Sequence, residues 1–343
     1  MNKETIKKLA STLIGLAVFF IFLGIAPSVL SNYIVFILNL LGIYILLTLS
    51  LNLTNGYTGI FNLGHAGFAA IGAYVSVLLT YPVPMRKLYK LPLLPPILGG
   101  PNYHWPFLPA VLMGGLIAAL IAIPVGLPAL RVRGHYLAVL TLGFMVIVET
   151  VFISLKDITK GALGISAIPV YTNLWWVYGW VLILIYVTWI LLHSSYGRAM
   201  LAIREDEIAA SAMGINITKF KLFSFVLSAF FQGIAGALYA HLTTNINPYD
   251  FSFGLTFLIV IMLIVGGAGT ITGCIIGASL ITIISYALKP IEEGLRLYGL
   301  VELIYAGMLI AIMIWRPTGI TGGKEFSISY ISKLLSKIRI EIE

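Results

Sequence analysis

Residues 174–193 read LWWVYGWVLILIYVTWILLH, and residues 194–221 read SSYGRAMLAIREDEIAASAMGINITKFK. The first stretch has no Asp, Glu, Lys or Arg and is long enough to cross a hydrocarbon core of about 30 Å. The second stretch carries charges at Arg198, Arg204, Glu205, Asp206, Glu207, Lys219 and Lys221. Each such charge costs about 2.5–3.5 kcal/mol at the bilayer centre. The pair therefore predicts a membrane-spanning helix followed by a segment that lies in water or against another protein.

The composition extends this contrast to the whole chain. Of the 343 residues, 59% are hydrophobic and 10% are charged, whereas a soluble globular protein has about 45–50% apolar and about 25% charged residues. The alternating segments of about ten residues that build a membrane β-barrel are absent. The sequence thus predicts an all-α polytopic membrane protein of the cell membrane, with residues 1–343 forming a single transmembrane domain.

We expect about ten transmembrane helices. Apolar runs of roughly 17–25 residues recur along the chain, with one shorter run at 254–267. The expected spans are residues 11–31, 33–53, 64–81, 107–130, 135–155, 174–193, 221–244, 254–267, 271–288 and 300–316.

Basic residues set the expected orientation, because cytoplasmic loops are enriched in Lys and Arg. With Met1 inside, 14 of the 21 basic residues fall in segments expected on the cytoplasmic side and 7 on the other side. This favours both termini inside (N-in/C-in). The proline-rich segment 82–106 is expected to be an irregular external loop, although it places Arg86, Lys87 and Lys90 outside. Because the net charge of +8 comes from loops and tails, topology explains it better than a nucleic-acid partner.

The charged segment 194–220 also has the signals of a short, fixed helix. Ser194 or Ser195 can cap its start, Gly214 stands where a helix would stop, and Asn216 can cap the next span. The sequence predicts one cytoplasmic helix at about 197–213. A solvated hairpin without a partner is one interpretation. The crowding of alanines favours the other, a rigid helix that a soluble protein approaches closely.

Motifs for catalysis are missing. The sequence has no G-x-x-x-x-G-K-[ST] phosphate loop, no H-E-x-x-H motif and a single cysteine, Cys274. We therefore expect no enzyme activity, no metal site and no cofactor in this chain. Glu149 and Glu302 are the only acids expected near membrane depth, which gives little support to a proton-coupled carrier.

A glycine-rich segment, NGYTGIFNLGHAG (55–67), is a poor helix interior. Broken backbone at membrane depth is tolerated where protein or a water-filled cavity satisfies it, and such segments often hold ligands in transporters. Its polar members Tyr57, Asn62 and His65 are candidates for the pathway or substrate site, with Glu149 and Glu302 at an external mouth. Tight helix packing on glycine is the alternative interpretation.

A second glycine pattern lies in the ninth expected span. Gly269, Gly273 and Gly277 recur every four residues. Small residues at this spacing let helix backbones approach closely in membranes, so we expect these three glycines to form a helix-packing face.

Four stretches together resemble a known family. They are LNLTNGYTGIFNLGHAGFAAIGAY (51–74), LRVRGHYLAVLTLGF (130–144), GRAMLAIREDEIAASAMGINITKFKLFSFVLSAFFQGIAGALYA (197–240) and IVGGAGTITGCIIGA (264–278). In order and spacing the chain is similar to the branched-chain amino acid permeases of ABC importers, and more closely to the second of their two permease types. Asn62 and Cys274 depart from the family pattern, which commonly has Ser and Pro there.

The resemblance implies a permease subunit that passes branched-chain amino acids across the membrane without catalysis of its own. It implies two ATP-binding subunits on the cytoplasmic face, a second related permease subunit and an external substrate-binding protein. ATP would be bound by the partner subunits. The charged segment would then be the coupling element, and its coupling residues are expected to be Arg204, Glu205, Asp206, Glu207, Ala210 and Gly214.

Two alternatives remain open at the level of sequence. Within the same family, the substrate is urea, a short amide or another amino acid. In a different class, the chain is a secondary carrier driven by an ion gradient, which would work alone and would not need a docking helix.

Overall fold

The computed structural model describes residues 15, 19–89, 91–92, 95–98, 100, 103–131, 136–323 and 325. The predictions that fall on residues 1–14 and 326–343, including several basic residues used for the orientation, lie outside the described residues. Within the described ranges the chain is all-helical: they contain no named strand, only an isolated antiparallel bridge between Ile165 and Ile246.

Seven helices in the described residues are long and apolar enough to cross a membrane, and three shorter apolar helices occupy the other expected spans. The long ones are α2 (Asn32–Asn55), α5 (Phe107–Ala129), α6 (Tyr136–Ser154), α8 (Leu174–His193), α11 (Ile217–Thr243), the segment Pro248–Gly266 and α13 (Ile271–Leu295). The segment Pro248–Gly266 contains η3 (Pro248–Phe251) and α12 (Phe253–Gly266). The shorter ones are Phe19–Val29, α3 (His65–Thr80) and α14 (Leu300–Trp315).

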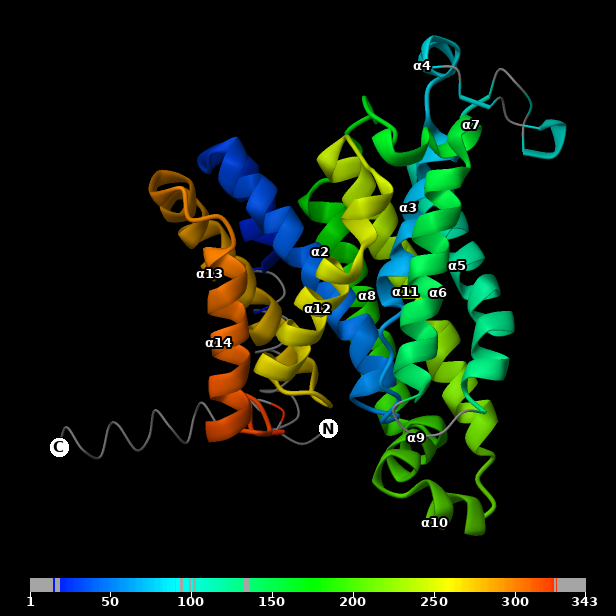
Figure 1. Ribbon diagram of the computed structural model, residues 1–343, viewed down its shortest axis with the longest axis vertical. Coiled ribbons are helices and arrows are strands. Elements are labelled where there is room, and N and C mark those ends of the chain that lie inside the picture. The colour runs from blue at the N-terminus through cyan, green and yellow to red at the C-terminus, as the bar shows by residue number, and fades with distance from the viewer. Residues whose placement is uncertain are drawn as a thin grey trace, which may run out of the picture.

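The long axes of these helices run roughly side by side, and the short helices lie at the two ends (Figure 1). At one end are α4 (Val83–Leu88) and α7 (Lys156–Thr159), with η1 (Pro96–Leu98) and η2 (Gly161–Leu163) in the same connections. At the opposite end are α9 (Ser195–Glu205) and α10 (Glu207–Ala212). The charged segment is thus separated from the proline-rich segment by the full length of the helices.

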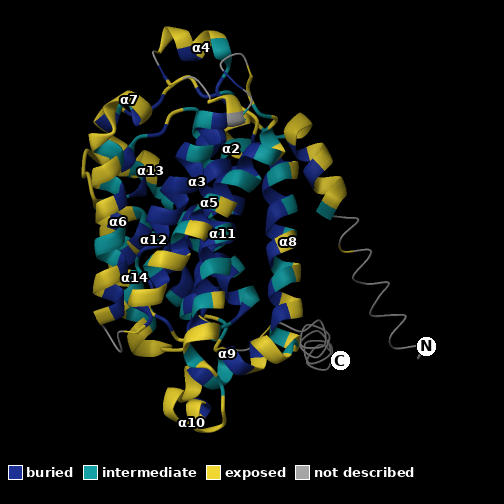
Figure 2. Cartoon of the chain, turned by 90° about the vertical axis from the view of Figure 1, so that its right-hand side faces the viewer, coloured by how far each residue is buried: buried dark blue, intermediate teal, exposed yellow. Residues whose placement is uncertain are grey.

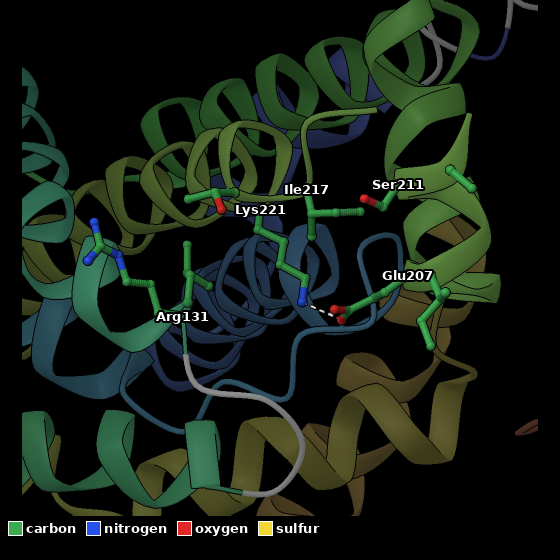
Figure 3. A pocket seen from close by; sticks show the side chains of 9 residues that line it. Arg131, Glu207, Ser211, Ile217 and Lys221 are labelled. Atoms are coloured by element: carbon green, nitrogen blue, oxygen red, sulfur yellow. Dashed lines mark hydrogen bonds and ion pairs between the residues drawn. The ribbon is translucent and has the colours of Figure 1, made fainter. Parts of the chain in front are cut away.

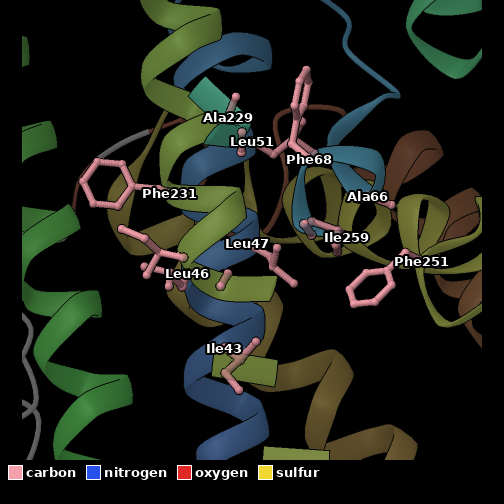
Figure 4. Close-up of a cluster of buried hydrophobic side chains, with 14 of the residues drawn as sticks. Ile43, Leu46, Leu47, Leu51, Ala66, Phe68, Ala229, Phe231, Phe251 and Ile259 are labelled. Carbon is pink, nitrogen blue, oxygen red and sulfur yellow. The ribbon is translucent and has the colours of Figure 1, made fainter. Parts of the chain in front are cut away.

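Helix α11 is the centre of the molecule and packs against α2, α3 and α5. In Figure 2 the buried residues are concentrated on these helices, whereas α10 is mostly exposed. The main apolar cluster includes Leu46 and Leu47 of α2, Phe68 of α3 and Phe231 of α11 (Figure 4). Burial of such side chains contributes about 1.5–3 kcal/mol each in water, but between helices in a bilayer close packing becomes the main source of stability.

Glycines bring the backbones of α3, α5 and α11 into contact. A Cβ added at Gly72 would lie 2.0 Å from the Gly233 carbonyl oxygen, and one added at Gly236 would lie 1.9 Å from the Ala69 carbonyl oxygen. A Cβ at Gly114 of α5 would lie 2.7 Å from the Gly72 oxygen. Only glycine fits at these crossings, because no side-chain motion can relieve a clash with backbone.

The expectation that 82–106 is wholly irregular is wrong, since its described residues include α4 and η1. A proline in the first turn of α4 is compatible with a helix start because its missing N–H would have no partner there. Arg86 of α4 is buried and donates to the carbonyl oxygens of Leu78, Leu79 and Tyr81 at the end of α3. Burial lowers the pKa of the Arg86 guanidinium. This cation therefore caps the end of α3.

Candidate functional site

The charged segment folds into two helices instead of the single helix predicted at 197–213. Helix α9 ends at Glu205 and α10 begins at Glu207, with Asp206 between them in an extended conformation (φ −157°). The Asp206 carboxylate accepts hydrogen bonds from the N–H groups of Ile208 and Ala209, at 2.8 and 3.0 Å. Aspartate is a preferred N-cap residue, so Asp206 ends one helix and starts the next.

The outer boundaries of the segment agree with the capping prediction. Ser194 accepts a hydrogen bond from the Gly197 N–H and caps α9, while Asn216 accepts one from the Lys219 N–H and caps α11. At the end of α10, Gly214 has φ +82° and donates to Ser211 O, while the next N–H, of Ile215, donates to Ala210 O. This pair of bonds is a Schellman motif, which requires the left-handed conformation that glycine adopts easily.

Arg204 points from the last turn of α9 toward the rest of the membrane domain. Its Nη1 donates to the Gly56 carbonyl oxygen at 2.9 Å, and its Nε and Nη2 donate to Glu205 Oε1 at 3.2 and 2.7 Å. Because its side chain is only 37% exposed, Arg204 is less available to an external partner than its neighbour Glu205, which is 73% exposed.

A second ion pair fixes α10 to α11. The Lys221 ammonium donates to the Glu207 carboxylate, and the Lys221 side chain is 7% exposed against 43% for Glu207. Beside this pair is an open cavity of about 850 Å³ between the end of α5, α10 and the start of α11, with Arg131, Ser211 and Ile217 among its lining residues (Figure 3). Since residues of α10 line it, the cavity lies at the end of the molecule that carries this helix.

The exposed residues of α10 differ from those expected to make contacts. Ala210 is buried, at 4% exposure, so it packs within the chain. Ile208 and Met213 are 76% and 83% exposed, and sequence reasoning missed them. The sequence does indicate them, since each is a large apolar residue within a polar segment expected to be helical. They project from this end beside Glu205 and Glu207, whose carboxylates pair with Arg204 and Lys221.

The glycine-rich segment interrupts the helical structure between α2 and α3, as predicted. Residues 57–64 are not helical, and side chains satisfy part of their backbone. The Asn62 N–H donates to Asn55 Oδ1, the Leu63 N–H to Thr141 Oγ1 and the Gly64 N–H to Asn62 Oδ1. Asn62 thus helps to hold the turn that precedes α3.

Tyr57, Asn62 and His65 are all buried, with exposures of 1%, 1% and 0%. The Tyr57 hydroxyl and both ring nitrogens of His65 make no hydrogen bond within the described residues. Since buried polar groups are nearly always hydrogen-bonded, these two side chains retain unused donor and acceptor capacity inside the domain.

Glu149 and Glu302 are not brought to the segment 57–64. Glu149 is half-buried on α6, and Glu302 is exposed in the first turn of α14. Glu302 lines a separate cavity of about 380 Å³ with Tyr44, Ser285 and Lys289 among its other lining residues. The five pathway candidates therefore do not form one cluster.

The expectation that Gly269 shares a helix face with Gly273 and Gly277 is wrong. Helix α13 begins at Ile271, and Gly269 lies before it in a turn with φ +84°. Gly273 and Gly277 do face α12: a Cβ added to Gly277 would lie 2.0 Å from Met262 O, and one added to Gly273 would lie 2.9 Å from Gly266 O. The turn is needed because α12 and α13 pack against each other as a hairpin.

The donor set gives no sign of a metal centre. Among the described residues, no group of three or more His, Cys, Asp and Glu side chains is placed to hold an ion. What this end of the molecule offers is a charged, well-capped surface connected directly to the broken segment between two membrane helices.

Comparison with known proteins identifies the family. The family model described as branched-chain amino acid transport system / permease component matches residues 33–315. The high-affinity branched-chain amino acid transport system permease protein LivM of Salmonella typhimurium is 32% identical over 328 residues, covering 86% of this chain and 71% of the relative. A probable LivM of Methanocaldococcus jannaschii is 24% identical, covering 87% and 95%.

The chain is also similar to permeases that carry the name LivH. LivH of Salmonella typhimurium is 26% identical, covering 82% of this chain and 92% of the relative. No solved structure matches the chain. The family match over most of the chain, together with a structure of apolar membrane-spanning helices, makes this chain a multi-pass membrane protein that belongs to the branched-chain amino acid transport permease family.

Proposed function

We propose that this chain is the permease subunit of an ATP-driven importer and passes branched-chain amino acids delivered by an external binding protein. It works with a second related permease subunit, and two ATP-binding subunits supply the energy. The chain itself catalyses no reaction, and it holds no cofactor. ATP is bound by the partner subunits.

The observation that carries the proposal is the structure of the α9–α10 segment. It is capped at the starts of α9 and α10 and at the end of α10, it is fixed to α11 by the Lys221–Glu207 ion pair, and it exposes Ile208 and Met213. Large exposed apolar residues on a polar surface commonly mark contacts with a partner protein. A rigid projection of this kind suits a membrane domain that must receive force from a soluble subunit.

In this proposal the coupling segment 194–220 lies on the cytoplasmic side, both termini are inside, and the three shorter apolar helices complete ten spans. The ATP-binding subunit contacts Glu205, Asp206 and Glu207 together with the apolar pair Ile208 and Met213. Ala210 and Gly214 hold the shape of α10, through a buried contact and the Schellman motif. The segment 82–106 with α4 faces the external side, where the binding protein arrives.

For the pathway we propose the unused polar groups of Tyr57 and His65, with Asn62 holding the turn between them. Both side chains are sealed in this conformation, so the segment 57–64 must open for substrate to reach them. Glu302, in its cavity at the start of α14, and Glu149 are proposed contacts at the external mouth for the ammonium group of an amino acid. The names of the relatives support branched-chain amino acids as the substrate class.

The test is reconstitution in proteoliposomes. This chain is co-purified with a sister permease and two ATP-binding subunits, and uptake of radiolabelled leucine is measured with the binding protein present. We expect uptake that requires ATP and stops when either the ATP-binding subunits or the binding protein is omitted.

Two other results would contradict the proposal. Leucine uptake by the chain alone under an ion gradient would show a secondary carrier. Uptake of urea or acetamide, with leucine neither transported nor competing, would keep the ATP-driven mechanism but replace the substrate class.

A further inference from the structure

Three segments that are distant in sequence meet at Arg204. They are the end of α2 with the turn after it, the end of α9, and the turn between α12 and α13. We define the Arg204 junction as Arg204 with Asn52, Gly56, Gly59 and Gly269. Arg204 donates to the Gly56 carbonyl oxygen at 2.9 Å and packs on both turns: a Cβ at Gly59 would lie 3.1 Å from Arg204 Cγ, and one at Gly269 would lie 2.7 Å from Arg204 Nη1.

Asn52 joins the end of α2 to the turn between α12 and α13. Its side-chain oxygen accepts from the Gly269 N–H at 2.8 Å, and its Nδ2 donates to Thr270 O at 3.2 Å. Asn52 is fully buried, and a Cβ at Gly56 would collide with its Oδ1 at 1.7 Å. The last turn of α2 and the turn before α13 are therefore joined by two hydrogen bonds of Asn52.

The glycines of the junction leave room for the guanidinium. Gly59 and Gly269 have φ of +71° and +84°, and in each case an added side chain would meet Arg204. Arg204 is held in this position from its other side by Glu205, which accepts two of its N–H groups. A planar guanidinium with five donors can hold a carbonyl and a carboxylate together, which a lysine cannot do with the same geometry.

We propose that Arg204 is a positioning residue that carries movement of the α9–α10 segment into the membrane domain, instead of a residue that docks the ATP-binding subunit. The proposal rests on the proposed function. Displacement of α9 by a partner would pull on Gly56 and, through Asn52, on the turn before α13. Since Gly56 begins the broken segment that carries Tyr57, Asn62 and His65, the same pull reaches the pathway candidates.

The test uses the complete reconstituted transporter and measures three quantities: leucine uptake, ATP hydrolysis and the amount of ATP-binding subunit that co-purifies. Arg204→Ala is expected to lower leucine taken up per ATP hydrolysed by about tenfold, equivalent to about 1.4 kcal/mol, with unchanged co-purification. Arg204→Lys keeps the charge and one bond, so a smaller loss of about threefold is expected. If Arg204→Ala does not fold, Arg204→Lys carries the test alone.

The matched control is Arg198→Ala. Arg198 lies on the same helix and has the same charge, but within the described part of the chain its side chain donates only to His193 O and Ser195 Oγ, close to it in sequence. Its uptake per ATP is expected to equal that of the wild type. If only the positive charge of the helix mattered, Arg204→Ala and Arg198→Ala would lower the uptake per ATP equally. That result would overturn the proposal.

Two further outcomes separate this inference from the function on which it rests. Wild-type uptake per ATP in both Arg204 variants would overturn the positioning role of Arg204 but not the proposed function. A loss of co-purified ATP-binding subunit that accounts for their lost uptake would do the same. Absence of ATP-driven uptake in the wild-type complex would overturn the proposed function and the junction with it.

Discussion

The contact between α3 and α11 and the segment α9–α10 are held together in opposite ways. In the first, Gly72 and Gly236 bring backbone against backbone, with no room for a single added carbon atom. In the second, more than half of the residues are exposed, and backbone N–H groups that donate to Ser194, Asp206 and Asn216 fix the helix starts. The membrane contact therefore depends on shape, whereas the charged segment depends on particular donors and acceptors.

The difference follows from the surroundings of the two regions. In a bilayer, lipid chains are as apolar as leucine, so helices gain stability mainly from close packing. At the α9–α10 end, water competes for every polar group, so a short helix of six residues such as α10 needs caps to persist. Substitutions that add volume should damage the first region, and substitutions that remove a hydrogen-bond partner should damage the second.

The largest expected effect is that of Gly72→Ala. The new Cβ would lie 2.0 Å from Gly233 O and 2.4 Å from Gly233 Cα, and the clash involves backbone that cannot rotate away. We expect a loss of about 3 kcal/mol or more, seen as aggregation or a much lower midpoint of thermal unfolding in detergent.

Gly143→Ala on α6 is the matched control. No heavy atom lies within 4 Å of a Cβ built there, and alanine favours a helix by up to about 1 kcal/mol over glycine. Its stability should be unchanged or slightly higher. Equal damage from both substitutions would show that helix propensity, and not the α3–α11 contact, decides the outcome.

The next effect concerns the ion pair that attaches α10 to α11. Glu207→Gln leaves the buried Lys221 ammonium without its counter-charge. Removing one partner of a buried pair costs about 3–5 kcal/mol, and we expect about 2 kcal/mol because Glu207 is 43% exposed and partly screened. Chemical unfolding of the purified chain measures the change.

The double variant Glu207→Gln/Lys221→Met provides the control for this pair. It removes both charges, so it should recover most of the stability lost by Glu207→Gln. If the two single losses simply add, Lys221 and Glu207 do not interact across the α10–α11 contact.

The smallest expected effect is that of Asp206→Ala, which removes the cap of α10. An N-cap substitution of this kind costs about 1 kcal/mol. Amide hydrogen exchange at Ile208 and Ala209, whose N–H groups now donate to Asp206, should become faster, while exchange in α11 is unchanged.

Asp206→Asn keeps a side-chain oxygen in the same position and should retain slow exchange. Fast exchange at Ile208 and Ala209 in the Asn variant would indicate that the negative charge, and not the hydrogen bond, holds α10 in place.

Most of the membrane architecture could be predicted from the sequence. Each expected span within the described residues has an apolar helix, because a run without charges has few stable alternatives in a bilayer. The caps at Ser194, Gly214 and Asn216 were also predictable, since a cap depends on residues only a few positions apart. Seven of the helices are long enough to span, so the predicted count of ten stays a prediction, as does the orientation.

The errors occurred where a second signal, local in one case and tertiary in the other, outweighs the pattern used for the prediction. The segment 197–213 contains good helix formers throughout, yet Asp206 interrupts it by capping the second half. Gly269 fits a four-residue repeat, yet the hairpin between α12 and α13 requires it in a turn. The contacts of Arg86 were not predicted, and its carbonyl partners at the end of α3 became visible only in the folded chain.

The sequence by itself determined that this protein crosses a membrane, which family it resembles, and where its long internal charged segment lies, because hydropathy and short motifs act over local stretches of chain. Tertiary structure decided how the charges in that segment are used. Arg204 turns inward to Gly56 and Lys221 is buried against Glu207, since their partners belong to other helices. Which charges face a partner and which hold the chain together depends on distances between segments, and only folding sets those distances.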